Sequence, residues 1–369
     1  MKRLRLTLAA LAASAFPLAA QPPVPIPDWA EAQIAESQQR FEAWRGQDQA
    51  VVFPIVTDVH SSRPAIAEPP DFSDSKMHIL FACRAAEKFK ADFIADLGDI
   101  GLDTPATAAP SNAQARLQAN VQLFGHTPVP VLFAMGNHDH GRQEFRVTNK
   151  LYGELFNGPM KKRFPTCVTG PDCDYGCFDV PEKRCRVFFL NSSDGAYYGF
   201  SLPQLQFLAD NLRLPAGHSA VVLQHLCVNA IGRWKSYPDR VAHGAVYTKI
   251  LEDFAAGAAG SLETVSWAFR KNRNARLVGS ISGDSHFDRQ LTTNGVTYVI
   301  TQGYGGISPK ELSEGCVVTP FSRASAMLID VAAIKPEKGE FRMFRIGAGG
   351  AARDRTFTFP PCRPDGLRR

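Results

Sequence analysis

The feature that most constrains this chain is an apolar run that ends abruptly in Gly136-Asn137-His138-Asp139. The run, Val129–Met135, has a proline near its start and otherwise predicts a buried strand. Glycine lets the backbone turn sharply where the strand ends, so an amide, an imidazole and a carboxylate project from one tight turn. In α/β sheets, sites are built at the carboxyl ends of strands. A surface turn is the alternative, because Gly, Asn and Asp are common in turns.

Four other β-rich runs also end in, or contain, side chains that can bind a metal ion. The polar residues at the five strand ends are Asp58, His60, Asp99, Asn137, His138, His225, Asp284 and His286. Each has an ordinary structural explanation when taken alone; His225, for example, fits a hydrogen-bonded histidine of the core. Burying so many carboxylates and imidazoles together without a cation would be unfavourable. The set therefore predicts a metal site that distant parts of the chain build together.

Helical patterns separate the early strands, and hairpins follow later in the chain. Helices are expected over Asp28–Arg45, Met77–Lys90, Ser111–Phe124, Arg142–Phe164, Leu202–Leu214, Val246–Ala256 and Leu262–Arg270. Strands are expected over Ala50–Thr57, Asp92–Leu97, Val129–Met135, Gly176–Val180, Arg184–Leu190, Ser219–Leu226, Arg276–Ser282, Phe287–Thr293, Val296–Thr301, Ala324–Val331 and Glu340–Ile346. Asn294-Gly295 is a strong hairpin-turn signal. This order predicts an α/β fold of two sheets packed face to face with helices outside.

The N-terminal segment 1–20 resembles a secretory signal peptide. Lys2, Arg3 and Arg5 form a positive stretch, and Leu6–Ala20 is an uncharged apolar run that ends in small residues. An N-terminal membrane anchor is the alternative, although the run is shorter than the roughly 20 residues that a span needs. We therefore expect this segment to be removed and the mature protein to be exported, either periplasmic or secreted, with no transmembrane segment.

Beyond the signal peptide, residues 21–49 are expected to form a lead-in and a helix, and residues 50–369 a single domain with a cysteine-rich insertion at about 165–186. The chain has eight cysteines, and in an oxidising compartment an even number predicts disulfides whose pairing the sequence leaves open. A zinc site within the insertion is the alternative, but its cysteines lack the paired C-x2-C spacing of structural zinc sites. These cysteines are Cys167, Cys173, Cys177 and Cys185.

The charge of the chain gives little reason to expect a nucleic-acid partner. Removing the signal peptide takes away three positive and no negative charges, so the formal net charge falls from +5 to +2. So small a charge attracts polyanions weakly, and no basic stripe with interleaved aromatic residues is evident. The sequence leaves the oligomeric state open.

In this order, the strand-end residues resemble the calcineurin-like metallophosphoesterase family. Its signature is Asp-x-His, Gly-Asp, Gly-Asn-His-Asp/Glu, a further His, and Gly-His-x-His, and the resemblance covers about residues 50–305. Gly199-Phe200-Ser201, followed by Gln204-Leu205, is similar to a helix entry of the same family. The resemblance implies a four-layer α/β/β/α sandwich of two mixed sheets. Asp58-Val59-His60 separates the chain from the purple acid phosphatases, which usually have Asp-x-Gly there.

The resemblance also implies two divalent or trivalent metal ions, Mn, Fe or Zn. Asp58, His60 and His286 would hold the first ion, Asn137, His225 and Asp284 the second, and Asp99 would bridge both. His138 would act on the phosphate as an acid or a positive charge, and Asp139 would orient its imidazole. The family has histidine where this chain has Asp284. An aspartate there either favours a harder cation or does not reach the metal.

The implied activity is hydrolysis of phosphate esters, in which water activated by both metals attacks phosphorus in line. Arg142, Arg233 and Tyr304 lie in loops that we expect to contact the substrate. A phosphomonoesterase is favoured; the alternative is a phosphodiesterase that acts on nucleotides or phospholipid head groups. The alternative of another class is a metal-bound binding protein without catalytic activity, which the unusual Asp284 keeps open.

Overall fold

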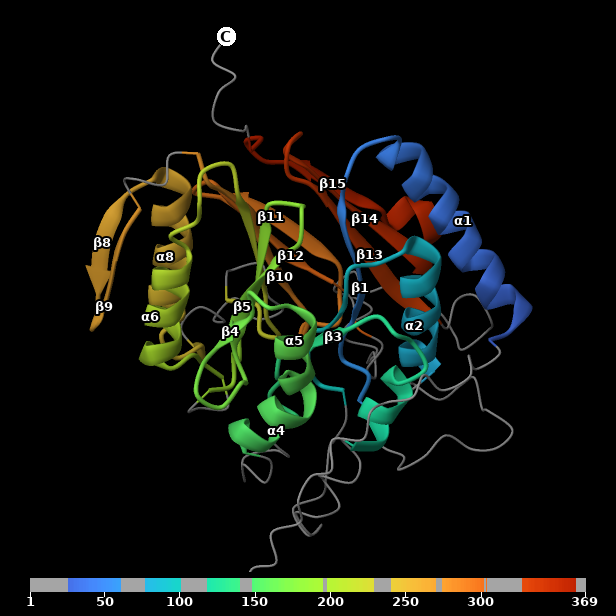
Figure 1. Cartoon of the computed structure of the whole chain (residues 1–369), viewed down its shortest axis with the longest axis horizontal. Helices are drawn as coiled ribbons and strands as arrows, with labels where there is room; N and C mark the ends of the chain where they lie inside the picture. The colour runs from blue at the N-terminus through green and yellow to red at the C-terminus, as the bar shows by residue number, and fades with distance from the viewer. Residues whose placement is uncertain are drawn as a thin grey trace, which may run out of the picture.

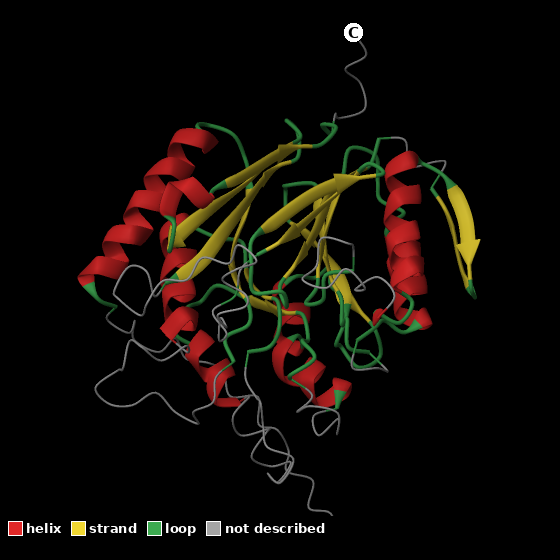
Figure 2. Cartoon of the chain, turned by 180° about the vertical axis from the view of Figure 1, so that it is seen from behind, coloured by secondary structure: helices red, strands yellow, loops and turns green. Residues whose placement is uncertain are grey.

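Two β-sheets face each other through apolar side chains, and helices cover their outer faces (Figures 1 and 2). The structure is a computed structural model. It describes residues 26–60, 77–100, 118–139, 148–194, 198–228, 240–269, 274–301, 303 and 327–362. The α/β/β/α arrangement that the sequence predicts is confirmed.

The first sheet has the strand order β15-β14-β13-β1-β2-β3. Its strands are β1 (Val51–Val56), β2 (Ile94–Asp96), β3 (Val131–Phe133), β13 (Leu328–Lys335), β14 (Glu340–Gly347) and β15 (Arg355–Thr358). Strands β1, β2 and β3 are parallel, and β13 pairs with β1 in the antiparallel sense. The segments that follow the three parallel strands therefore leave the sheet at one edge.

The second sheet has the strand order β11-β12-β10-β7-β6-β5-β4. Its strands are β4 (Val168–Thr169), β5 (Gly176–Val180), β6 (Cys185–Phe189), β7 (Ser219–Leu223), β10 (Arg276–Ser282), β11 (Arg289–Thr293) and β12 (Val296–Ile300). Strands β6, β7, β10 and β12 are parallel, so their carboxyl ends also share one edge. The cysteine-rich segment supplies β4, β5 and the start of β6.

Three apolar clusters hold the four layers together. The helices are α1 (Asp28–Arg45), α2 (Met77–Phe89), α4 (Asn149–Phe156), α5 (Gly158–Arg163), α6 (Leu202–Asn211) and α8 (Gly244–Ala256), with a 3-10 helix η2 (Gly350–Arg353). Helices α1 and α2 pack on the first sheet, and α6 and α8 on the second. Between the sheets, Phe53 stacks on Phe93 with ring centroids 4.7 Å apart. Burying one such ring contributes about 1.5–3 kcal/mol.

The helix predicted over Leu262–Arg270 is wrong, because this segment takes part in a hairpin. Strand β8 (Ala259–Leu262) pairs with β9 (Val265–Ala268), and Glu263 turns the chain with a φ of 53°. Burial alternates along β9, where Val265 and Trp267 face the core of the second sheet. This two-residue period is the signal of a strand, and it was present in the sequence.

The single helix predicted over Arg142–Phe164 is also wrong, because two short helices stand there. Helix α4 ends and α5 begins at Asn157, which is fully buried. The Asn157 side chain bonds both the N–H and the C=O of Phe133 at 3.0 Å, so it ties the break to strand β3. Residues 140–147, the start of the predicted helix, lie outside the described residues.

No disulfide joins any two of the seven cysteines in the described part of the chain. The predicted disulfides therefore find no support there, and Cys316 lies outside these residues. The groups of metal-capable side chains found among the described residues contain no cysteine, so the zinc alternative also finds no support. The signal-peptide segment 1–20 lies outside the description. Across the described residues, no helix has the length and apolar character that a membrane span requires.

Candidate metal centre

The carboxyl edges of both sheets meet, and the metal-capable side chains lie where they meet. Asp58 and His60 follow β1, Asp99 follows β2, and the Asn137-His138 turn follows β3. From the second sheet, His225 follows β7, and the pair Asp284 and His286 follows β10. The structure thus brings together all eight strand-end residues that the sequence singled out. We call Asp58, His60 and His286 the first group and Asn137, His225 and Asp284 the second group, with Asp99 shared between them and His138 beside them.

The first group has the spacing of ligands around one ion. His286 Nε2 lies 3.1 Å from Asp58 Oδ1 and 3.4 Å from His60 Nε2. His60 Nε2 lies 3.8 Å from Asp58 Oδ1 and 3.7 Å from Asp99 Oδ2. Atoms that bind one ion at about 2.1 Å stand about 3–3.5 Å from one another. The three side chains therefore surround a point that a cation fits.

The second group surrounds the Nε2 atom of His225. This atom lies 3.1 Å from Asn137 Oδ1, 3.2 Å from Asp99 Oδ2 and 3.7 Å from Asp284 Oδ1. Ligand atoms of Asp58, Asp99 and His225 also lie within 4.8 Å of one another, so the carboxylates of Asp58 and Asp99 connect the two groups.

The hydrogen bond at the other nitrogen of His225 fixes which atom faces the site. Nδ1 lies 2.7 Å from the carbonyl oxygen of Leu97 and donates its proton there. When the ring is neutral, Nε2 then carries a lone pair and points at the oxygens of the second group. This carbonyl–histidine arrangement is the usual support of a metal-binding imidazole.

Left-handed backbone marks the turns that carry these ligands. Asp58, His60, Asp99, Asp284 and His286 have φ values of 53°, 46°, 53°, 63° and 55°. Residues other than glycine seldom adopt this conformation, although Asn, Asp and His do so more often than most. Each costs on the order of 1 kcal/mol or more, and such residues cluster at functional sites. This strained backbone directs the side chains toward the site.

Burial and mutual charge set the protonation of the carboxylates. Burial opposes the ionisation of Asp99, but His225, His138 and His60 outweigh it and lower the pKa of Asp99 to about 2. The pKa of Asp58 is also lowered, because His286 and His60 outweigh burial. Burial, together with Asp58 and Asp99, raises the pKa of Asp284 to about 7. Three carboxylates in so small a space thus repel one another, and a cation would relieve that repulsion.

The Asp139 carboxylate is held by backbone groups of two turns. It accepts hydrogen bonds from the backbone N–H groups of Asp99, Ile100 and Gly136 at 2.8–3.1 Å. The Tyr152 hydroxyl of helix α4 lies 3.4 Å from it. Asp139 therefore clamps the turns after β2 and β3 together. Gly136 is needed at this junction, because a Cβ there would lie 2.2 Å from Asp99 Oδ1.

His138 stands at the rim of the site. Its backbone N–H donates to Asp99 Oδ1 at 2.8 Å, and its Nε2 lies 4.0 Å from Asp99 Oδ2. The imidazole packs edge-on to His60, with centroids 5.1 Å apart, and its side chain is 24% exposed. It is thus open to solvent, while Asp99 beside it is buried.

Gly303, in a stretch that the sequence places near the cleft, lies against the first group. A Cβ at Gly303 would lie 2.3 Å from the Cβ of Asp58, so only glycine lets the segment after β12 pass the first group. A Gly just beyond an apolar strand was the available signal. Arg142, Arg233 and Tyr304 lie outside the described residues.

The residues present fit a pair of metal ions. The buried Asp58 Oδ1 accepts no well-aligned hydrogen bond among the described residues, yet it faces two imidazole nitrogens. The donor set combines carboxylate oxygens, an amide oxygen and imidazole nitrogens, which suits Mn, Fe or Zn.

Comparison with known proteins supports the fold. No family model and no curated protein matches the chain. A dimetal phosphatase of Danio rerio is similar in structure, with a TM-score of 0.56 and 14% identity, over 85% of this chain and all of that chain (100%). GAP50, the anchor in the inner membrane complex of Plasmodium, has a TM-score of 0.49 and 12% identity over 86% of this chain and 90% of its own. A purple acid phosphatase from yellow lupin seeds has a TM-score of 0.44 and 14% identity over 85% and 54%.

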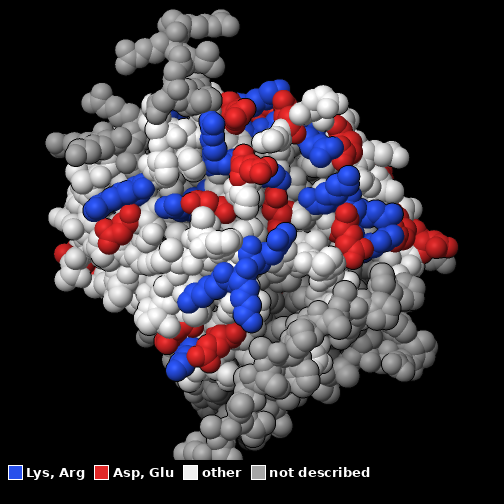
Figure 3. Space-filling model, viewed as in Figure 1, with Lys and Arg blue, Asp and Glu red and all other residues white. Residues whose placement is uncertain are grey.

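The Danio rerio enzyme identifies the class of fold, and the other two structures are too different in shape to add to it. The chain has the same fold as that dimetal phosphatase, two mixed sheets packed face to face with helices outside. On the face seen in Figure 3, the described Lys and Arg side chains are interspersed with Asp and Glu and form no continuous basic band.

Proposed function

We propose that this chain is an exported, metal-dependent phosphoesterase that works with two metal ions. One observation carries the proposal: two groups of ligand-spaced donors, linked by Asp58 and Asp99, lie at the carboxyl edges of a metallophosphoesterase fold. Asp58, His60 and His286 would hold one ion, and Asn137, His225 and Asp284 the other. Asp99 would contact both.

When bound, two such ions activate a water molecule and neutralise charge on the phosphate oxygens. The protein's own contribution is to hold the donors in place. Leu97 fixes the ring of His225 through the 2.7 Å contact to its carbonyl oxygen, and Asp139 joins the turns that carry Asp99 and Asn137. These contacts set the donor positions before any ion or substrate arrives.

His138 is positioned to act on the substrate rather than on the metal. Its imidazole is partly exposed, and its Nε2 lies 4.0 Å from the carboxylate of Asp99, so it can contact a phosphate ester that reaches the metal centre. A protonated imidazole there stabilises a negative phosphate oxygen or gives its proton to the leaving oxygen. Activity should therefore need His138 even where the metals are already bound.

We favour phosphomonoesters as substrates, with phosphodiesters of nucleotides or phospholipid head groups as the alternative. The direct experiment compares hydrolysis of p-nitrophenyl phosphate and bis(p-nitrophenyl) phosphate, each with Mn²⁺ and with chelator. Turnover that requires metal supports the proposal, and the faster ester decides between the two substrate classes. Turnover that survives complete removal of metal would contradict it.

Asp284 favours a second candidate, a metal-bound binding protein without turnover. Its carboxylate adds negative charge where the family pattern has a neutral imidazole, and this weakens the pull of an ion on phosphate. If the protein binds Mn²⁺ but hydrolyses neither ester, the Asp284→His variant becomes decisive. A gain of hydrolysis in that variant would assign the inactivity to this one residue.

A further inference from the structure

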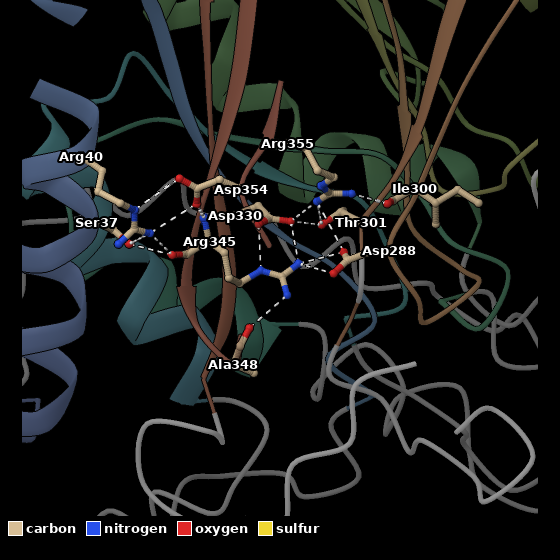
Figure 4. Close-up of polar contacts among 10 residues, drawn as sticks. All are labelled: Ser37, Arg40, Asp288, Ile300, Thr301, Asp330, Arg345, Ala348, Asp354 and Arg355. Carbon is tan, nitrogen blue, oxygen red and sulfur yellow. Dashed lines mark hydrogen bonds and ion pairs between the residues drawn. The ribbon is translucent and has the colours of Figure 1, made fainter. Parts of the chain in front are cut away.

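Figure 4 shows a largely buried cluster of two arginines and two aspartates, of which Asp288 lies two residues beyond His286 of the first group. We call Asp288, Asp330, Arg345 and Arg355 the arginine–aspartate cluster. We propose that Arg345 is a positioning residue, which holds His286 and Asp58 at ligand spacing through Asp288 and Asp330. The inference rests on the proposed function, because it concerns the same metal ligands.

Arg345 is the centre of this cluster. It lies on β14, is 1% exposed, and its guanidinium contacts both aspartates. Nε donates to Asp330 Oδ1 at 2.9 Å, and Nη2 donates to Asp330 Oδ2 at 3.1 Å. The same Nη2 lies 2.8 and 3.0 Å from the two oxygens of Asp288. Two-oxygen contacts of this kind fix direction as well as distance.

Asp288 links Arg345 to the turn that carries His286. It lies two residues beyond His286 and directly before β11, and its side chain is 6% exposed. Phe287, the one residue between them, has little freedom because it is buried in the core of the second sheet. Arg345, a residue of the first sheet, therefore holds the turn that delivers a ligand from the second sheet.

The other arm of the cluster supports Asp58 from two sides. Asp330 on β13 stands opposite Ile55 on β1, three residues before Asp58. Thr301 Oγ1 donates to Asp330 Oδ2 at 2.5 Å, and Arg355 contacts the same oxygen. Thr301 precedes Gly303, the residue that passes against Asp58. A shift of Asp330 would thus displace Asp58 in two ways, through the pairing of β13 with β1 and through Thr301 and Gly303.

The cluster is neutral in itself, so it does not compete for a cation. Two arginines balance two aspartates, whereas the ion pairs of Asp58 and Asp99 among the described residues are with imidazoles. The α1 helix also takes part, since Ser37 and Arg40 each donate to the Arg345 carbonyl oxygen at 2.7 Å (Figure 4). These contacts make the cluster a rigid support that joins the α1 layer to both sheets.

The test uses conservative variants and binding of Mn²⁺ alone, measured by calorimetry. Arg345→Lys keeps the positive charge but loses the guanidinium that contacts two carboxylate oxygens at once. Asp288→Asn keeps the shape of the side chain but loses its charge. Each should weaken Mn²⁺ binding about 10–100-fold, as loss of a ligand's support does. Lys335→Met is the matched control, because Lys335 is a buried cation of β13 that contacts Trp44, Asp48 and Glu340 instead of the site.

A second readout, the ¹⁵N–¹H resonances of the His286 ring in the chelated protein, tests positioning without metal. One sharp set is expected in the natural chain and in Lys335→Met, and exchange-broadened signals in Asp288→Asn. Unchanged affinity and unchanged spectra in both variants would overturn the inference, as would an equal loss of affinity in Lys335→Met. If the natural chain binds no Mn²⁺ while Asp288→Asn still broadens the His286 signals, the proposed function fails and the positioning role stands.

Discussion

Two buried charged clusters lie side by side at the junction of the sheets, and they are neutralised in opposite ways. In the arginine–aspartate cluster, each carboxylate meets a guanidinium within 3.1 Å. In the metal centre, Asp58, Asp99 and Asp284 pair with imidazoles, Asp58 and Asp99 accept backbone N–H groups as well, and the backbone at all three residues is left-handed. The charge pairing within the arginine–aspartate cluster indicates a structural role. The three crowded aspartates on left-handed turns indicate a cation-binding site.

The largest effect should follow the loss of the carboxylate that both groups share. Asp99→Ala removes an oxygen that lies 3.2 Å from His225 Nε2 and 3.7 Å from His60 Nε2, so neither group keeps its full donor set. We expect metal content measured by mass spectrometry to fall sharply and ester hydrolysis to drop to background. Asp179→Ala on β5 is the control, since Asp179 pairs with Arg186 away from the site. Full metal content in the Asp99 variant would show that Asp99 is not a metal ligand shared by the two groups.

His138→Ala should separate chemistry from metal binding. Metal content is expected to stay at the natural level, because His138 lies at the rim with its Nε2 4.0 Å from Asp99 Oδ2. The rate of hydrolysis at saturating substrate should fall about 10²–10⁴-fold, the range for loss of a general acid. A fall in metal content that matches the fall in rate would make His138 a ligand instead.

A smaller effect is expected at Gly303, where the segment after β12 touches the first group. Gly303→Ala would place a Cβ 2.3 Å from the Cβ of Asp58, and overpacking of this kind costs about 1–3 kcal/mol. Mn²⁺ binding should weaken with the loss of stability. Gly158→Ala is the control, because an added Cβ at Gly158 meets nothing within 4 Å. Equal stability and equal Mn²⁺ affinity in the two variants would show that Gly303 is not needed beside Asp58.

The arginine–aspartate cluster should make the free energy of unfolding depend on pH. Burial opposes ionisation of Asp330, but Arg345 and Arg355 outweigh it and lower its pKa from 3.8 to about 2. A lowered carboxyl pKa contributes stability that is present above the unfolded value and is lost as pH falls toward the folded value. The free energy of unfolding should therefore lose about 2 kcal/mol between pH 4 and pH 2 through Asp330.

Denaturant titrations of the natural chain and Asp330→Asn should show this as a difference in stability that shrinks over that range. Asp210→Asn serves as the comparison, since Asp210 is half-exposed and pairs only with Arg213 three residues away. A constant difference for Asp330→Asn from pH 4 to pH 2 would mean that the arginines do not hold this carboxylate charged.

The sequence predicted the site better than it predicted the parts between. Apolar runs that end in Asp, His or Asn are local signals, and the parallel order of β1, β2 and β3 brings their ends together. The hairpin at Asn294-Gly295 was equally local, and β11 and β12 confirm it. Helix Leu262–Arg270 was misread because its composition outweighed the alternation of Val265 and Trp267. Strand β13 runs from Leu328 to Lys335, and residues 324–326 of the strand predicted there lie outside the described residues.

Contacts between distant residues could not be read from the chain. Nothing local to Arg345 shows that it pairs with Asp288, 57 residues away. The role of Asp139 was likewise hidden, because its partners are backbone groups of Asp99 and Ile100, which the fold alone brings to it. Residue type showed which side chains can bind a metal, but only the three-dimensional structure shows what holds them.

The central claim is that Asp99 stands between two cations. Anomalous scattering from crystals grown with Mn²⁺ measures this directly. We expect two peaks that flank the Asp99 carboxylate, one beside Asp58, His60 and His286 and the other beside Asn137, His225 and Asp284. No peak, or a single peak that does not touch Asp99, would contradict the two-metal account.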